Sequence, residues 1–305
     1  MSAVTQLLDA GRVLVLVGGF AYAAREDLRS REVSDTLWQI LGVVGIALGA
    51  VVVAPGGALA LVLWIVVGAF ALEHLVAWDD ALGERHAAWV PAIELAIYAV
   101  VIALVSAAAY RWGVGPSSVP LGVIAATATI VLARALFEAG ILYGGADAKA
   151  LIAVGVLVPV FAQPLLFAPA SASAALAVLP FSVALLTNAA VFSVVVPLVI
   201  GARNAARGEF SFPKGFTGYT LAVEELPRRF VWVRDPALGE DTLVHDAETS
   251  ADDTARRVEI AEKLKAAGVR RVWVTPQLPF LVLMAVGAFA ALLAGNLLLD
   301  LFAAL

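Results

Sequence analysis

The chain has 305 residues, of which 62% are hydrophobic and 15% are charged, whereas soluble domains carry about 45–50% apolar and about 25% charged residues. This composition excludes an ordinary globular enzyme and predicts a polytopic membrane protein. The absence of cysteine excludes disulfides, thiol nucleophiles and cysteine-ligated metals. A net charge of −5 without a basic stripe argues against nucleic-acid binding.

Eight stretches are apolar enough to cross a bilayer, which takes about 20 residues. They cover residues 4–24, 36–54, 57–77, 88–110, 119–141, 148–170, 174–201 and 277–303. The N-terminus has neither a basic region nor a signal-peptide cleavage site, so we expect the first span to be retained. The sequence thus predicts an all-α polytopic membrane protein of about eight transmembrane helices.

Lysine and arginine placement predicts the orientation, because cytoplasmic loops carry an excess of these residues. One set of connections holds Arg25, Arg29, Arg31, Arg85, Lys149 and twelve more basic residues in 202–276, and the opposite set holds essentially only Arg111. We therefore expect a multi-pass protein of the cell membrane, with its N-terminus outside and segment 202–276 cytoplasmic.

Segment 202–276 is the one stretch that looks soluble, and it separates the membrane helices of 1–201 from a last helix in 277–305. Short strands are expected near 219–223, 230–233 and 270–274, because β-branched and aromatic residues cluster there. A helix should begin near Ser250 or Asp252 and end at Gly268. Together these predict a small cytoplasmic α+β insert with an exposed acidic loop over 239–253.

Two polar islands interrupt the hydrophobic pattern, at 25–35 and at 144–149, and each places a carboxylate at the end of a span. Acids in such positions are energetically unfavourable and usually functional. If Asp27 and Asp147 lie close together they cannot both ionise cheaply, so they would share a proton. One could then activate water while the other protonates a carbonyl, as in aspartic proteases. Gly144 and Gly145 would let a substrate backbone come close.

Each polar residue also has a structural explanation. Asp27 could be an interfacial acid paired with a neighbouring arginine, and Asp147 could cap the sixth span. Asp35 is interpreted as the cap of the second span, and Arg29, Arg31 and Lys149 as topology signals with a possible supporting role at the site. Arg134 and Glu138 are spaced to pair along one helix face. The scattered histidines His74, His86 and His245 have no metal-ligand spacing, so neither a metal nor a cofactor is expected.

Three segments resemble the archaeal preflagellin and prepilin peptidases, which are GxGD-type intramembrane aspartyl proteases of the type IV prepilin peptidase family. They are residues 27–33 followed by Asp35 and Trp38, the motif Gly144-Gly145-Ala146-Asp147, and residues 274–280 at the start of the last span. The resemblance implies that Asp27 and Asp147 are the catalytic pair. It also implies that the partners are pilin or archaellin precursors, whose short basic leader would be removed at the cytoplasmic face.

The chain departs from that family at two points. Ala146 replaces the second glycine of the motif, and four expected spans separate the two aspartates where the family usually has two. An even number of spans still leaves both acids on one face. The cysteine pairs of the bacterial relatives are missing, so we expect peptidase activity without methyltransferase activity.

Three other functions were weighed against this one. Presenilin-like and signal-peptide-peptidase-like proteases place their first aspartate inside a span beside tyrosine, unlike Asp27 in its basic segment. An ion- or proton-coupled transporter would use the acids as a binding site, although the repeats common in carriers are not found. A scaffold for pilus assembly would have no use for the glycine-aspartate loop.

Overall fold

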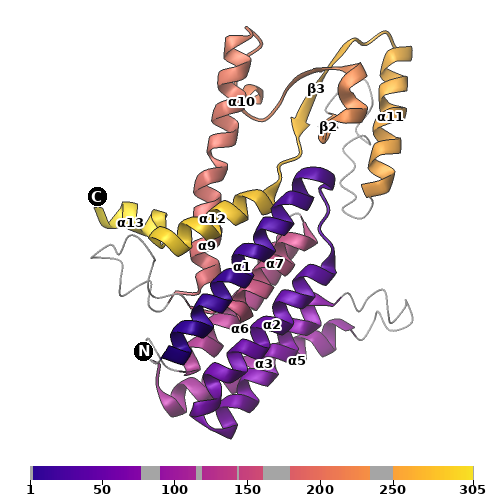
Figure 1. Cartoon of the computed structure of the whole chain (residues 1–305). Coiled ribbons are helices and arrows are strands. Elements are labelled where there is room, and N and C mark those ends of the chain that lie inside the picture. The colour runs from indigo at the N-terminus through magenta and orange to yellow at the C-terminus, as the bar shows by residue number, and fades with distance from the viewer. Residues whose placement is uncertain are drawn as a thin grey trace.

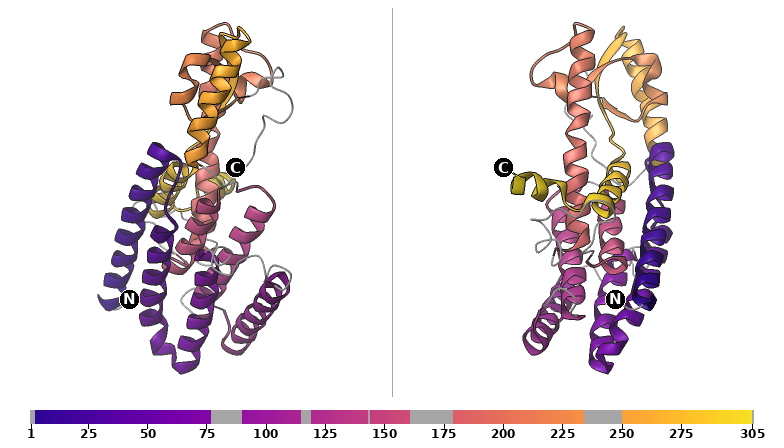
Figure 2. Two further views of the ribbon diagram at one scale, coloured as in Figure 1. Left: turned by 90° about the vertical axis from the view of Figure 1, so that its right-hand side faces the viewer. Right: turned by 60° about the vertical axis from the view of Figure 1, so that its left-hand side comes forward.

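The computed structural model describes residues 3–76, 90–114, 119–142, 144–160, 179–233 and 250–304. Figures 1 and 2 show an elongated bundle of helices with a smaller lobe at one end, and the N-terminus lies toward the opposite end of the bundle. Arg85, His86 and His245, together with most of the expected acidic loop, lie outside the described residues.

Six helical segments are long and apolar enough to cross a membrane, which supports a helical membrane protein. They are Gln6–Ser30, Asp35–Gly56, Ala58–Leu75, Ala92–Trp112, Val119–Glu138 and Phe181–Ala206. They are formed by the helices α1 (Ala3–Ser30), α2 (Asp35–Val53), α3 (Ala58–Leu75), α5 (Val90–Trp112), α6 (Val119–Glu138), α9 (Phe181–Ser193) and α10 (Val195–Ala206). These agree with the first five expected spans and the seventh. The sixth begins with α7 (Gly145–Leu157), and its second half lies outside the described residues.

Helix α7 lies at the centre of the bundle, in contact with α1, α2, α3, α6 and α9. Residues 150–157 are all buried, as expected of a helix that is apolar on every side. Glycine permits the close contact with α2, because a Cβ atom on Gly45 would lie 2.7 Å from the backbone of Leu157. The N-terminal turn of α7, which carries Asp147, is thereby held in a fixed position.

The last expected span, 277–303, is divided into α12 (Phe280–Ala294) and α13 (Leu297–Ala304). Gly295 adopts a positive φ of 81° at the break. Asn188 of α9 holds this turn, since its Nδ2 donates to Gly295 O at 2.8 Å and its Oδ1 accepts from Leu297 N at 2.9 Å. Hydropathy alone could not reveal the break, because both helices are apolar.

The lobe contains the expected secondary structure. Strands β1 (Tyr219–Ala222) and β2 (Val231–Val233) both pair antiparallel with the central β3 (Arg271–Pro276). Helix α11 (Ser250–Ala266) packs against the 3-10 helix η4 (Val223–Arg228). After α11 the chain turns at Gly268, whose φ is 75°. Leu226, Leu264 and Val274 belong to a small core that is separate from that of the bundle.

Candidate active site

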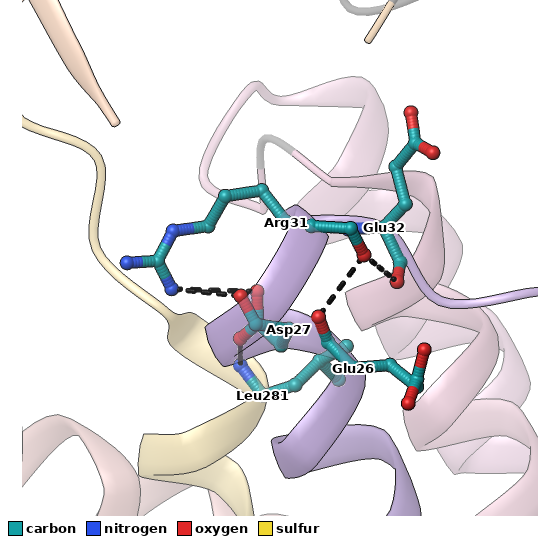
Figure 3. A network of polar contacts seen from close by, with 6 residues as sticks. Glu26, Asp27, Arg31, Glu32 and Leu281 are labelled. Atoms are coloured by element: carbon teal, nitrogen blue, oxygen red, sulfur yellow. Dashed lines mark hydrogen bonds and ion pairs between the residues drawn. The ribbon is translucent and has the colours of Figure 1, made fainter. Parts of the chain in front are cut away.

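The first polar island includes the C-terminal end of α1, and Arg31 is the residue that follows this helix. Arg31 has a left-handed φ of 62°, and its Nη1 donates to Asp27 O at 2.9 Å. The same Nη1 lies 3.8 Å from Asp27 Oδ1, so the guanidinium satisfies a carbonyl at the helix end and faces the carboxylate (Figure 3). Among the described residues Arg25 pairs with Glu26 instead, and Arg29 is exposed without an ion pair.

The side chain of Asp27 is buried, with 6% of the residue exposed. Its Oδ2 accepts a hydrogen bond of 3.0 Å from the backbone N–H of Leu281, in the first turn of α12 (Figure 3). The first N–H groups of a helix have no partner within it and favour a negative charge. Asp27 therefore links α1 to the N-terminus of α12. Of the neighbouring arginines with which an ion pair was expected, Arg31 is the one that faces its carboxylate.

The second polar island begins α7. Gly144 is the N-cap and Asp147 lies in the first turn, donating its backbone N–H to Gly144 O at 3.0 Å. The interpretation of Asp147 as the cap is therefore wrong, although the first turn still suits a carboxylate. A Cβ on Gly144 would lie 2.9 Å from Asp147 Oδ2, whereas one on Gly145 would meet no atom within 4 Å. Gly144, and not Gly145, leaves room for this carboxylate.

The fold brings Asp27 and Asp147 close enough to interact electrostatically. Asp147 lies outside the six apolar segments, and burial together with the negative charge of Asp27 raises its carboxyl pKa to about 7. A backbone hydrogen bond with Gly144 acts in the opposite direction. Two acids that are 120 positions apart in the sequence thus interact across the fold, Asp27 buried at the end of α1 and Asp147 partly buried in the first turn of α7.

Lys149 and Asp35 support this arrangement from one side. Lys149 Nζ lies 2.5 Å from Asp35 Oδ2, so it joins the start of α7 to the start of α2. The sequence interpretation of Asp35 as an N-cap is wrong, because Ser34 is the cap and its Oγ accepts from Thr36 N. Lys149 is thus an ion-pair partner of Asp35, while Asp147 contacts Gly144 and interacts electrostatically with Asp27.

Phe230 of the lobe contacts the site, and the sequence interpretation missed it. The guanidinium carbon of Arg31 lies 5.1 Å from the centre of the Phe230 ring, and that of Arg257 lies 5.4 Å from it. Gln277, just before α12, donates its backbone N–H to Phe230 O at 2.9 Å. The lobe therefore holds the same arginine that faces Asp27. In the sequence Phe230 looked only like the start of a short strand.

A second polar cluster joins α3, α5 and α6. Arg134 pairs with Glu138 at 2.8 Å, as expected from their spacing, and also with Glu94 at 3.5 Å. His74 Nε2 lies 2.6 Å from the hydroxyl of Tyr98. The sequence interpretation missed this assembly because its members come from three separate helices. Within the described residues no group of three or more His, Cys, Asp or Glu is arranged to hold a metal ion.

Replacing Gly144 by alanine should displace the Asp147 carboxylate while leaving the fold intact, because the clashing atom belongs to a short side chain that can rotate. We expect the leader-cleaving activity predicted from the sequence to fall about tenfold or more, since small displacements of catalytic groups have effects of this size. Gly145→Ala is the matched control and should keep full activity. Thermal midpoints of both variants in detergent should stay near that of the wild type; equal activities would contradict the role of Gly144.

The stability of the folded protein should depend on pH through the raised pKa of the Asp147 carboxyl. Its pKa is about 7 in the folded protein and roughly 4 in an unfolded chain, so the folded state binds more protons between these pH values. Stability from this group is therefore greatest below pH ~4 and is lost as the pH rises through ~7. Asp147→Asn should raise the thermal midpoint relative to the wild type at pH 8 but much less at pH 4. A difference that does not change with pH would show that the carboxyl is not perturbed.

Neither the protein-family models nor the curated protein sequences match this chain. The resemblance carried by the two aspartate motifs therefore stays a prediction.

Proposed function

We propose that the chain is a membrane aspartyl endopeptidase that removes the short basic leader from precursors of type IV pilins or archaellins. The observation that carries this proposal is the electrostatic interaction of the buried Asp27 with the partly buried Asp147, which come from the end of α1 and the start of α7. A raised carboxyl pKa suits an acid that keeps its proton near neutral pH. Asp147 is thus the candidate for the group that protonates the substrate carbonyl.

Asp27 is the candidate base in this scheme. Its oxygens face the Arg31 guanidinium and the Leu281 N–H, and both contacts favour the ionised form. An ionised Asp27 would take a proton from water as the water attacks the peptide carbonyl, while Asp147 gives its proton to the carbonyl oxygen. Because the two acids interact, they titrate as a pair and the two roles belong to that pair.

An apolar cavity of about 520 Å³ between α1, α9 and α12 offers a place for the rest of such a substrate. Its lining includes Phe20 and Ala21 on α1 and Ala285 and Phe289 on α12. Phe20 precedes Asp27 by seven residues, about 10 Å along the helix. A hydrophobic helix bound in this cavity would have its leader end beside the aspartates, which is the geometry that leader removal requires.

The second candidate function is an ion- or proton-coupled transporter. The polar cluster of His74, Tyr98, Glu94 and Arg134 favours it, because titratable side chains between apolar helices often mark ion pathways. The transporter would use the acids to bind a cation or to pass a proton, and it would need no peptide substrate. The two functions therefore differ in whether a precursor loses its leader.

The decisive experiment is to co-express a pilin or archaellin precursor with the wild type, Asp27→Asn or Asp147→Asn and to follow the mass of the precursor. Asparagine keeps the shape of the side chain and removes the titrating proton. We expect each variant to lose at least about a hundredfold in cleavage, the size of effect typical of general acid–base groups. Glu32→Gln is the control, because Glu32 is an exposed acid of the same polar island.

Cleavage that persists in either aspartate variant would show that this acid is structural. If the wild type cleaves none of several precursors, the transporter function becomes the better explanation, and proton flux in reconstituted vesicles would then be measured with Glu94→Gln.

Filling the apolar cavity should slow the cleavage of full-length precursors selectively. Ala21→Trp places an indole in the cavity, and we expect about tenfold slower cleavage because an anchoring site for the substrate helix is lost. Leu14→Trp is the control, since Leu14 is 73% exposed on the same helix and does not line the cavity. A soluble peptide that spans the leader but lacks the hydrophobic helix should be cleaved equally by both variants. Unchanged cleavage of the full-length precursor by Ala21→Trp would disprove binding in this cavity.

A further inference from the structure

A cavity of about 350 Å³ lies between the end of α10 and the sheet of the lobe, away from the two aspartates. Four arginines line it: Arg203, Arg207, Arg229 and Arg271. Arg203 lies in α10 and Arg207 directly follows it, Arg229 directly follows η4, and Arg271 begins β3. One lining residue, Glu225, is acidic. Because the arginines come from separate helices and strands, it is the tertiary structure that brings them to one cavity.

The carboxylates nearby neutralise only part of this charge. Arg271 pairs with Glu209 at 2.9 Å, and Arg229 pairs with Glu225 at 3.6 Å with both side chains exposed. The exposed Arg229–Glu225 pair is weak and opens easily, whereas Arg271 also donates to Thr220 Oγ1 at 2.6 Å and stays fixed beside the cavity. Arg203 stacks over the ring of Tyr219 at 4.3 Å. Among the described residues, no carboxylate forms an ion pair with Arg207 or Arg203, so the cavity keeps an excess of positive charge.

A structural explanation accounts for part of the cluster. Cations are favoured at the C-terminus of a helix, so the dipole of α10 explains Arg203 and Arg207. It does not explain Arg229 or Arg271, which approach the same space from the lobe. Glu225 and Glu209 balance two of the four guanidinium groups, and the positive charge of the other two has no carboxylate partner among the described residues. The arrangement therefore points to a bound anion.

The neighbourhood of the cavity indicates where this anion comes from. Val195, Leu198 and Val199 on α10 are 54–60% exposed and directly precede Arg203 in the sequence, so the apolar surface of the helix ends about one turn before the arginines. Phe210 and Phe212, shortly after α10, are also exposed. Basic residues next to an apolar helix surface lie at the level of lipid headgroups.

We propose that this cavity binds the phosphate group of an anionic phospholipid headgroup. Guanidinium groups bind phosphate through paired, charge-assisted hydrogen bonds, and the free donors of Arg203 and Arg207 supply them. Arg229 contributes further donors when its exposed pair with Glu225 opens, and Arg271 adds positive charge at the wall of the cavity. A lipid bound there would attach the lobe to the membrane surface beside α10. This inference does not depend on the proposed peptidase activity.

The test uses the full-length protein in detergent micelles that contain phosphatidylcholine, with the thermal midpoint as the readout. Phosphatidylglycerol is titrated in one arm and inorganic phosphate in another, each against sodium chloride at equal ionic strength. Both phosphates should raise the midpoint of the wild type. The variant Arg203→Gln with Arg207→Gln should need about tenfold more of either, since charged hydrogen bonds are lost.

The matched control is Arg228→Gln with Arg270→Gln, which removes the same charge from exposed positions of the lobe outside the cavity. It should respond as the wild type does. A response to phosphatidylglycerol that only the cavity variant loses supports the proposal, whether or not inorganic phosphate acts too. A response to inorganic phosphate alone overturns the lipid source. No response, or equal losses in the two double variants, overturns the site itself.

Discussion

The rest of the site depends on the contacts that hold the Asp27 carboxylate in place. Its oxygens meet the first turn of α12 through Leu281 and the guanidinium of Arg31, so one buried charge joins the end of α1 to the start of the last apolar segment. Arg31 in turn stacks on Phe230, which connects the lobe to the same point. A buried carboxylate needs such partners, because without them its desolvation would be strongly unfavourable. The chain therefore has a structural reason to fix Asp27 where it is.

The same constraint explains how a structural role and a chemical role can coincide. Asp27 is held by donors, whereas Asp147 lies in the first turn of α7 with fewer partners and in electrostatic contact with Asp27. Acid–base chemistry by two carboxylates requires that their surroundings differ, and the donors around Asp27 differ from those around Asp147. Gly144 contributes by leaving space for the Asp147 carboxylate. Rigidity comes from α7, which is buried on all sides.

The lobe has two distinct relations to the membrane part. Through Phe230 and Gln277 it contacts Arg31 and the segment leading into α12. On its other side it completes the arginine-lined cavity at the end of α10. A phosphate bound in that cavity would hold the lobe on the membrane, and the lobe would in turn hold Arg31 against Asp27. Lipid composition and the geometry of the two acids would then be connected through one small α+β unit.

The sequence by itself determined the class of protein, the apolar helices, the strands of the lobe and the two acids worth testing, because hydropathy, charge and propensity are properties of neighbouring residues. Only the tertiary structure decided that Leu281 meets Asp27, that Phe230 meets Arg31, and that Asn188 holds the break at Gly295 in the last segment. It also decided that four arginines meet at one cavity. These features depend on how helices pack against one another, and a local pattern cannot encode contacts between residues that lie hundreds of positions apart.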